Sequence, residues 1–295
     1  MAAPVVGAGG EGMKTGTVFY KMSGSGNDFV MFDGRHTSAE ELTPEAIVAV
    51  CDRRMGIGAD GVGLLEPSGA DGIDFRFRFW NRDGTAGPMC GNGALCATRL
   101  AVQLELARPD AEVRFETSAG LHLGRLVGDR SEIVLPDCPS PAAAPAVRTV
   151  AGEECPTLVT PSVPHLVLTV ADVEAVAVAE RGPLLRRDPA TGAGGANVNW
   201  MSPAGDGSWK MRTFERGVEG ETLACGTGAV ACALTLGRRG LAASPARLWT
   251  RSGLPLDVSF DSGPSTASSI RLAGEGRLVF RGIMQSLPTQ SHPSA

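Results

Sequence analysis

The chain has 295 residues, of which 43% are hydrophobic and 20% are charged, and its formal net charge is -5 at pH 7. This composition is typical of a globular protein of about two domains and excludes a disordered chain. The negative charge argues against nucleic acid or an anionic membrane as a partner, and no stretch reaches the ~20 apolar residues that cross a bilayer. We therefore expect a soluble, cytoplasmic protein that acts on a small molecule.

The first half of the chain is predicted to alternate strands with helices, as an α/β (α+β) protein does. A Gly-Ser-Gly-Asn turn separates the first two strands, and Thr43 with Pro44 opens the first helix as a cap and a first-turn proline. A second helix begins at Cys90. The strands are expected at 17–22, 28–33, 61–67 and 74–80, followed by a hairpin at 112–117 and 120–127.

The second half is predicted to repeat this order after a segment rich in proline and alanine, 136–149, which has no periodicity and is typical of a crossing between domains. We expect one half at 14–135, a second half at 136–274, and disordered tails at 1–13 and 287–295. The second half carries a helix after Cys225. Its strands, and one that follows it, are expected at 165–170, 196–201, 209–215, 248–251, 256–260 and 277–280.

An internal repeat stands out against this background. MCGNGA begins at Met89 and ACGTGA begins at Ala224, and each cysteine is followed by Gly-X-Gly and an alanine-rich, helix-like run. Cysteine at the same place in both copies, within halves of similar order, predicts a duplicated architecture with two matched sites. The other cysteines, at 51, 96, 138, 155 and 232, have no neighbours that indicate chemistry.

Cys90 and Cys225 each directly precede a predicted helix start. The free backbone N–H groups and the positive end of the helix dipole are expected to stabilise a thiolate, lowering its pKa from about 8.5, and to bind a carboxylate. Two matched thiols suit the inversion of a carbon next to a carboxylate, because one removes a proton from one face while the other returns a proton to the opposite face. Such a reaction needs no cofactor.

Other interpretations of these motifs are weaker. GIGADG at 56–61 formally fits the dinucleotide-binding fingerprint, but a predicted helix precedes it and a strand follows it, which is the reverse of the required order. The cysteines lack the pair-and-pair spacing of zinc sites, and the chain has only four histidines. We therefore expect neither a nucleotide cofactor nor a metal.

The chain resembles the diaminopimelate epimerase family from about Phe19 to Gly282, through blocks that occur in the family's order. These blocks are KMSGSGNDFVMFD, GIGADG, FWNRDGTAGPMCGNGA, VPH, NVNWM and ERGVEGETLACGTGA. The resemblance implies two pseudo-symmetric halves, each a mixed sheet wrapped around a central helix, with the active site in the cleft between them and a return strand at about 275–286. It also implies cofactor-independent interconversion of LL- and meso-diaminopimelate, in lysine and peptidoglycan precursor synthesis, with a homodimer as a candidate assembly.

Carried over position by position, the resemblance makes Cys90 and Cys225 the acid and base. The backbone N–H groups of four residues would hold the reacting carboxylate: Gly91, Asn92, Gly226 and Thr227. His165 and Glu215 would lie near the reacting amino group. The remaining substrate-binding positions, largely at the distal end, are Asn27, Asn81, Asn197 and Arg216.

Three positions depart from the family's common residues: Val163, Gly61 and Ser23 stand where asparagine, glutamine and histidine are frequent. These departures bear on substrate identity more than on reaction type. A racemase of another amino acid on the same scaffold therefore stays open, although Asn81, Asn197 and Arg216 argue against it. A non-catalytic binding protein is disfavoured by the presence of both cysteines.

Overall fold

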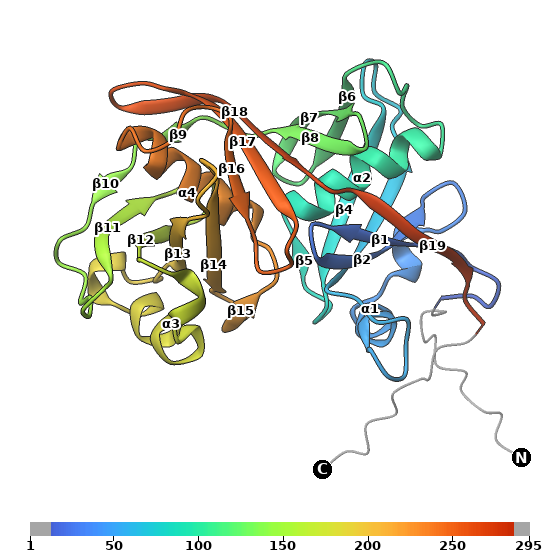
Figure 1. Cartoon of the computed structure of the whole chain (residues 1–295). Coiled ribbons are helices and arrows are strands. Elements are labelled where there is room, and N and C mark those ends of the chain that lie inside the picture. Colours follow the sequence, from blue (N-terminus) through green and yellow to red (C-terminus); the bar gives the residue numbers. More distant parts are fainter. Residues whose placement is uncertain (1–12, 286–295) are drawn as a thin grey trace, which may run out of the picture.

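The computed structural model describes residues 13–285, so the predicted tails lie outside the described residues, apart from Met13. The first half of the chain contains a strand pair, a helix, three strands, the long helix α2 and three more strands (Figure 1). The elements are β1 (Val18–Gly24), β2 (Asn27–Asp33), α1 (Pro44–Cys51), β3 (Gly61–Pro67), β4 (Phe75–Asn81), β5 (Ala86–Gly87), α2 (Gly91–Gln103), β6 (Val113–Thr117), β7 (Gly120–Val127) and β8 (Arg130–Val134).

The second half repeats this order after two very short strands. Its elements are β9 (Cys138–Pro139), β10 (Ala142–Ala143), β11 (Glu154–Val159), β12 (His165–Thr169), α3 (Val178–Arg186), β13 (Asn197–Pro203), β14 (Trp209–Glu215), β15 (Gly220–Thr222), α4 (Gly226–Arg238), β16 (Ala246–Trp249), β17 (Pro255–Ser262), β18 (Thr266–Gly274) and β19 (Arg277–Ile283). The segment 136–149, predicted as a crossing between domains, contains the two shortest of these strands: β9 pairs with β18 and β10 pairs with β11.

Strand pairing is the same in both halves. In the first half β2 lies between antiparallel β1 and parallel β3, β4 lies between antiparallel β3 and parallel β6, and β7 and β8 follow as antiparallel strands. The series from β11 through β12, β13, β14, β16, β17 and β18 has the same sequence of antiparallel and parallel pairs. The predicted fold class, an α+β protein of two similar halves, is confirmed.

Two strand pairs bear on the boundary between the halves. β8 is antiparallel to β18, which joins the two sheets, and β19 is antiparallel to β1, so the end of the chain returns to the first half (Figure 1). We propose on this basis that residues 14–135 with the return strand form one half and residues 136–274 form the other.

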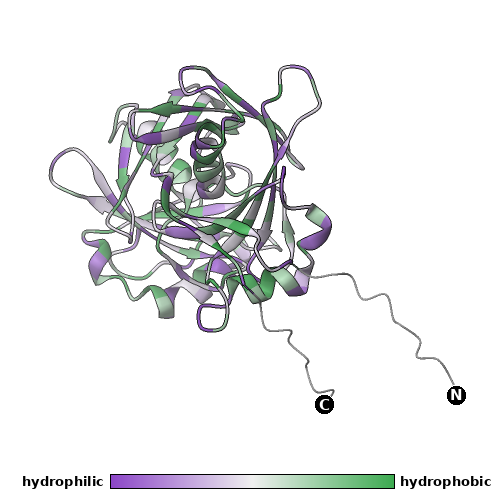
Figure 2. Ribbon diagram, turned by 90° about the vertical axis from the view of Figure 1, so that its right-hand side faces the viewer, coloured by the Kyte–Doolittle hydropathy of each residue, from purple (hydrophilic) through white to green (hydrophobic). Residues whose placement is uncertain are grey.

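Each half folds around one apolar helix. Nine of the thirteen residues of α2 and ten of the thirteen of α4 are buried, because alanine, leucine and cysteine cover these helices on all sides. In Figure 2 the strands curve around such a helix. The close approach is visible at Gly124 of β7, where a Cβ atom would lie 2.7 Å from Thr98 Oγ1 of α2. The outer faces of the sheets are covered by the smaller helices α1 and α3, whose buried side chains belong to separate clusters.

The predicted start of the first helix is confirmed at atomic detail. Thr43 is the N-cap of α1, its Oγ1 accepts a hydrogen bond of 3.3 Å from the Ala46 N–H, and Pro44 occupies the first helical position. Proline costs nothing at this position because the first-turn N–H groups have no partner within the helix.

Candidate active site

The two central helices begin at the same place in the molecule. Cys90 and Cys225 are the N-cap residues of α2 and α4, both with extended backbone. A Cβ atom on Gly226 would lie 3.9 Å from Gly91 Cα and 2.9 Å from Leu272 Cδ2, so the two helix starts abut. The free N–H groups of both helices therefore converge on one small region, where they favour an anion.

The cysteine environments do not match the expected low thiol pKa. Burial raises the pKa of Cys90 to about 11, and it raises the pKa of Cys225 well above its ordinary value, with the charge of Glu215 adding to both effects. The helix N-termini act in the predicted direction, since Gly228 N–H donates to Cys225 Sγ at 3.3 Å. Desolvation of the charged form outweighs them, so the expectation of a lowered pKa was wrong.

Glu215, at the end of β14, faces the thiols. Burial raises the pKa of its carboxyl, while hydrogen bonds from the Thr222 hydroxyl and from Cys225 oppose the shift. A carboxylate in this position both disfavours thiolates by its charge and offers an acceptor to an ammonium group. An ammonium bound beside Glu215 would offset its charge and ease ionisation of a thiol.

His165 is fully buried at the start of β12 and is linked to Cys225 through Thr227. Its Nε2 lies 2.9 Å from Thr227 Oγ1, and that hydroxyl lies 3.6 Å from Cys225 Sγ. Asn199 Nδ2 lies 3.0 Å from the other ring nitrogen. Burial lowers the pKa of His165 to about 3, so the ring is neutral at physiological pH.

Asn197 and Arg216 meet beside this histidine. The backbone N–H of Arg216 donates to Asn197 Oδ1 at 2.7 Å, and Asn197 Nδ2 lies 3.2 Å from His165 Nε2. Among the described residues, the Arg216 guanidinium donates to two backbone carbonyls, Gly194 O at 3.5 Å and Gly195 O at 3.2 Å. Within residues 13–285 it has no carboxylate partner. The planar guanidinium is therefore available to bind a carboxylate with two parallel hydrogen bonds.

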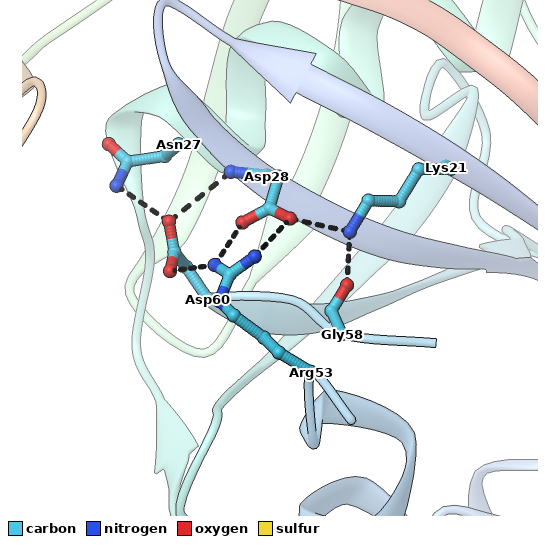
Figure 3. A network of polar contacts seen from close by, with 6 residues as sticks. All are labelled: Lys21, Asn27, Asp28, Arg53, Gly58 and Asp60. Carbon is cyan, nitrogen blue, oxygen red and sulfur yellow. Dashed lines mark hydrogen bonds and ion pairs between the residues drawn. The ribbon is translucent and has the colours of Figure 1, made fainter. Parts of the chain in front are cut away.

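Asn27 and Asn92 connect the first half to the same junction. Asn92 Nδ2 donates to Asn27 Oδ1 at 2.6 Å and reaches Ala224 O, the residue before Cys225, at 3.5 Å. Asn27 Nδ2 in turn donates to Asp60 Oδ2 at 3.1 Å. Figure 3 shows that Asp60 belongs to an ion-pair network with Arg53, Asp28 and Lys21.

Comparison with known proteins identifies the group to which this arrangement belongs. A sequence model of the diaminopimelate epimerase family matches residues 19–135 and 157–264. The chain belongs to this family. The diaminopimelate epimerase of Gemmatimonas aurantiaca is 48% identical over 288 residues, covering 91% of this chain and 99% of that protein. The diaminopimelate epimerase of Aquifex aeolicus is 37% identical over 273 residues, covering 90% and 96%.

Solved structures of lower sequence identity share the fold of this epimerase. A probable proline racemase from Agrobacterium radiobacter has a TM-score of 0.66 at 17% identity, covering 93% of this chain and 94% of that one. A phenazine biosynthesis protein from Bacillus anthracis has a TM-score of 0.67 at 14% identity, covering 92% and 99%. No helix in the described part of the epimerase is long and apolar enough to cross a membrane.

One predicted site residue of the epimerase is not tied to the cysteines. Asn81 is exposed, and its Nδ2 donates to Thr85 Oγ1 at 3.1 Å. Hydrogen bonds within residues 13–285 thus join His165, Glu215, Thr227 and Asn197 into one cluster with Cys225, while Asn81 lies outside it.

The three unusual positions have identifiable surroundings. A side chain at Gly61 would meet the ring of Phe79 at 2.7 Å, so that ring fills the space. Ser23 donates to Glu275 Oε2 at 2.9 Å, and Val163 is half-buried two residues before His165.

Sequence reasoning missed Thr222, Asn199 and Asp60 as neighbours of the site. All three lie inside blocks quoted for the family, which was the available signal.

Proposed function

We propose that this epimerase interconverts LL- and meso-diaminopimelate without a cofactor, as a step in the synthesis of lysine and of peptidoglycan precursors. The observation that carries the proposal is the pair of cysteines at the starts of two abutting central helices. The diaminopimelate epimerase relatives cover nearly the whole chain, which supports the substrate.

In the proposed reaction one thiolate removes the α-proton and the thiol on the opposite face donates its own proton to the carbanion. The two groups exchange protonation states in each turnover, so protons balance and either direction is available. N–H groups at the starts of α2 and α4, from Gly91, Asn92, Gly226 and Thr227, stabilise the carboxylate and the negative charge that develops on it. The raised thiol pKa makes each thiolate, once formed, a stronger base.

The remaining polar groups suit the rest of the substrate. Glu215 accepts from the reacting ammonium, which offsets the charge that disfavours a thiolate. The His165 ring, neutral at physiological pH, supports Cys225 through Thr227. Arg216 and Asn197 bind the distal carboxylate, with Asn81 and Asn27 as further distal contacts.

A homodimer is the proposed assembly. β19 pairs with β1 and with no other strand in the described chain. It exposes the large apolar side chains of Val279, Phe280 and Ile283, at 47%, 49% and 62% of their surface. Apolar side chains exposed on an edge strand with one unpaired side are typical of a surface that another chain covers.

The substrate assignment is tested by incubating the purified, reduced protein with LL-diaminopimelate and, separately, with L-proline, and separating stereoisomers by chiral chromatography. We expect meso-diaminopimelate to accumulate toward equilibrium without an added cofactor, while L-proline stays unchanged, because the distal groups require a second amino acid end. Racemisation of proline at a comparable rate, or inert diaminopimelate, would reject this substrate.

A further inference from the structure

Asn92 carries an unusual atom. Its Oδ1 is buried and has no hydrogen-bond partner within residues 13–285, although most buried polar atoms have one. The oxygen lies beside the start of α4, because a Cβ atom on Gly226 would be 3.4 Å from it. The question is what keeps the amide in an orientation that leaves its oxygen unpaired.

The orientation is set by a relay of hydrogen bonds that runs from Asp60 through Asn27 to Asn92. This relay has only one consistent set of donors and acceptors. An ionised Asp60 can only accept, so Asn27 must turn its NH₂ group toward it and its oxygen toward Asn92. Asn92 must then present its own NH₂ group to Asn27, and the Ala224 carbonyl, which also only accepts, agrees with that orientation. In this orientation the Asn92 oxygen meets no hydrogen-bond donor of the described part of the chain.

Asp60 is itself held in place by charge. Arg53 Nη2 donates to Asp60 Oδ1 at 2.7 Å and to Asp28 Oδ1 at 2.6 Å, and Lys21 pairs with Asp28 on the far side (Figure 3). The cluster contains two cations and two anions, so opposite charges hold Asp60 firmly, while its own charge adds to the raised pKa of Cys90. A network with several shared charges holds its members better than an isolated surface pair does.

We propose that Asp60 is a positioning residue of the active site, which fixes the amide of Asn92 through Asn27. In this orientation the NH₂ group of Asn92 tethers the start of α2 to the residue before Cys225, and its free oxygen accepts a donor from the molecule that fills the junction. The inference rests on the proposed function for its catalytic consequence, but the relay itself exists without substrate.

A double-substitution cycle tests the relay. The proteins compared are the wild type, Asp60→Ala, Asn92→Ala and the double variant, with Asp71→Ala as a control for losing an exposed carboxylate in the same half. We expect Asp60→Ala to lower kcat by up to about 100-fold, since small misplacement of groups at a reacting centre has effects of that size. In the Asn92→Ala background the same substitution should change kcat by less than about twofold. Equal factors in both backgrounds would overturn the relay.

A second measurement needs no substrate. The shift in the urea midpoint caused by Asp60→Ala should be smaller when residue 92 is already alanine, because the two side chains share Asn27 as partner. Equal midpoint shifts in the two backgrounds would contradict the relay, whatever the substrate. If the wild type leaves diaminopimelate unchanged while the urea shifts are unequal, the proposed function fails and the relay stands.

A milder variant covers the case in which Asp60→Ala does not fold. The Arg53 side chain is 55% exposed, so Arg53→Gln should fold, and Arg54→Gln is its matched control because Arg54 is exposed and its side chain is outside the network. We expect Arg53→Gln to lower kcat several-fold, with the loss absent in the Asn92→Ala background. Equal activity of the two glutamine variants would contradict the role given to the network.

Discussion

Replacement of either Cys90 or Cys225 by alanine should lower the rate of diaminopimelate inversion by on the order of 10⁴-fold, the upper range for a general acid or base. Each thiol serves one face of the α-carbon, so one cysteine cannot both remove and return the proton. The helix starts, Glu215 and Arg216 remain in each variant, so substrate should still bind. Chiral separation of the product gives inversion, and calorimetry gives binding.

Cys232→Ala is the matched control. This cysteine is buried in α4, the helix that Cys225 caps, and belongs to the main apolar core, so its loss should affect stability slightly and inversion little. An alanine variant at Cys90 or Cys225 that keeps inversion within tenfold of the wild type would rule out the two-thiol mechanism. A large loss in Cys232→Ala would show that the assay reports folding.

Acid should destabilise the epimerase through His165 in particular. The pKa of this ring is about 3 in the folded protein because burial disfavours the cation, against an ordinary value of 6.5. Below pH 6.5 the unfolded chain binds a proton that the folded chain does not bind, so stability falls as pH decreases from 6.5 toward 3. The difference between the two pKa values corresponds to a loss of roughly 5 kcal/mol in the free energy of unfolding once both states bind the proton.

The comparison that isolates this effect uses His165→Gln. Glutamine cannot take up a proton, so the variant should lose less unfolding free energy than the wild type between pH 6.5 and 4, by about 1.4 kcal/mol per pH unit. Urea denaturation at a series of pH values gives both slopes. Parallel slopes would mean that His165 titrates normally and is not held neutral by the fold.

Much of the architecture could be predicted because local signals agreed with the global fold. The repeated cysteine turns located the starts of both central helices, Thr43 and Pro44 marked α1, and alternating phenylalanines marked β4. Strand β18 was not predicted. Its run TASSIRLAG is polar at first, and Ser269 adopts a positive φ of 53° beside a register shift against β17, so its alternation is broken.

The chemistry of the site was harder to predict than its residues. A helix N-terminus alone predicts a low thiol pKa, but burial depends on the packing of both halves and reverses the sign at Cys90. The relay from Asp60 through Asn27 to Asn92 joins residues up to 65 positions apart in the sequence. No helix or strand periodicity predicts a contact at such a separation. Such contacts depend on tertiary structure.

The most direct test of two cysteines acting on opposite faces is the source of the proton in the product. Purified, reduced protein is incubated with LL-diaminopimelate in D₂O without cofactor, and the meso product is isolated early and examined by proton NMR and mass spectrometry. We expect one deuterium at the inverted α-carbon, because the donating thiol has equilibrated with solvent. Product that keeps the original protium would mean that a single group carries the proton across, and would contradict the two-thiol mechanism.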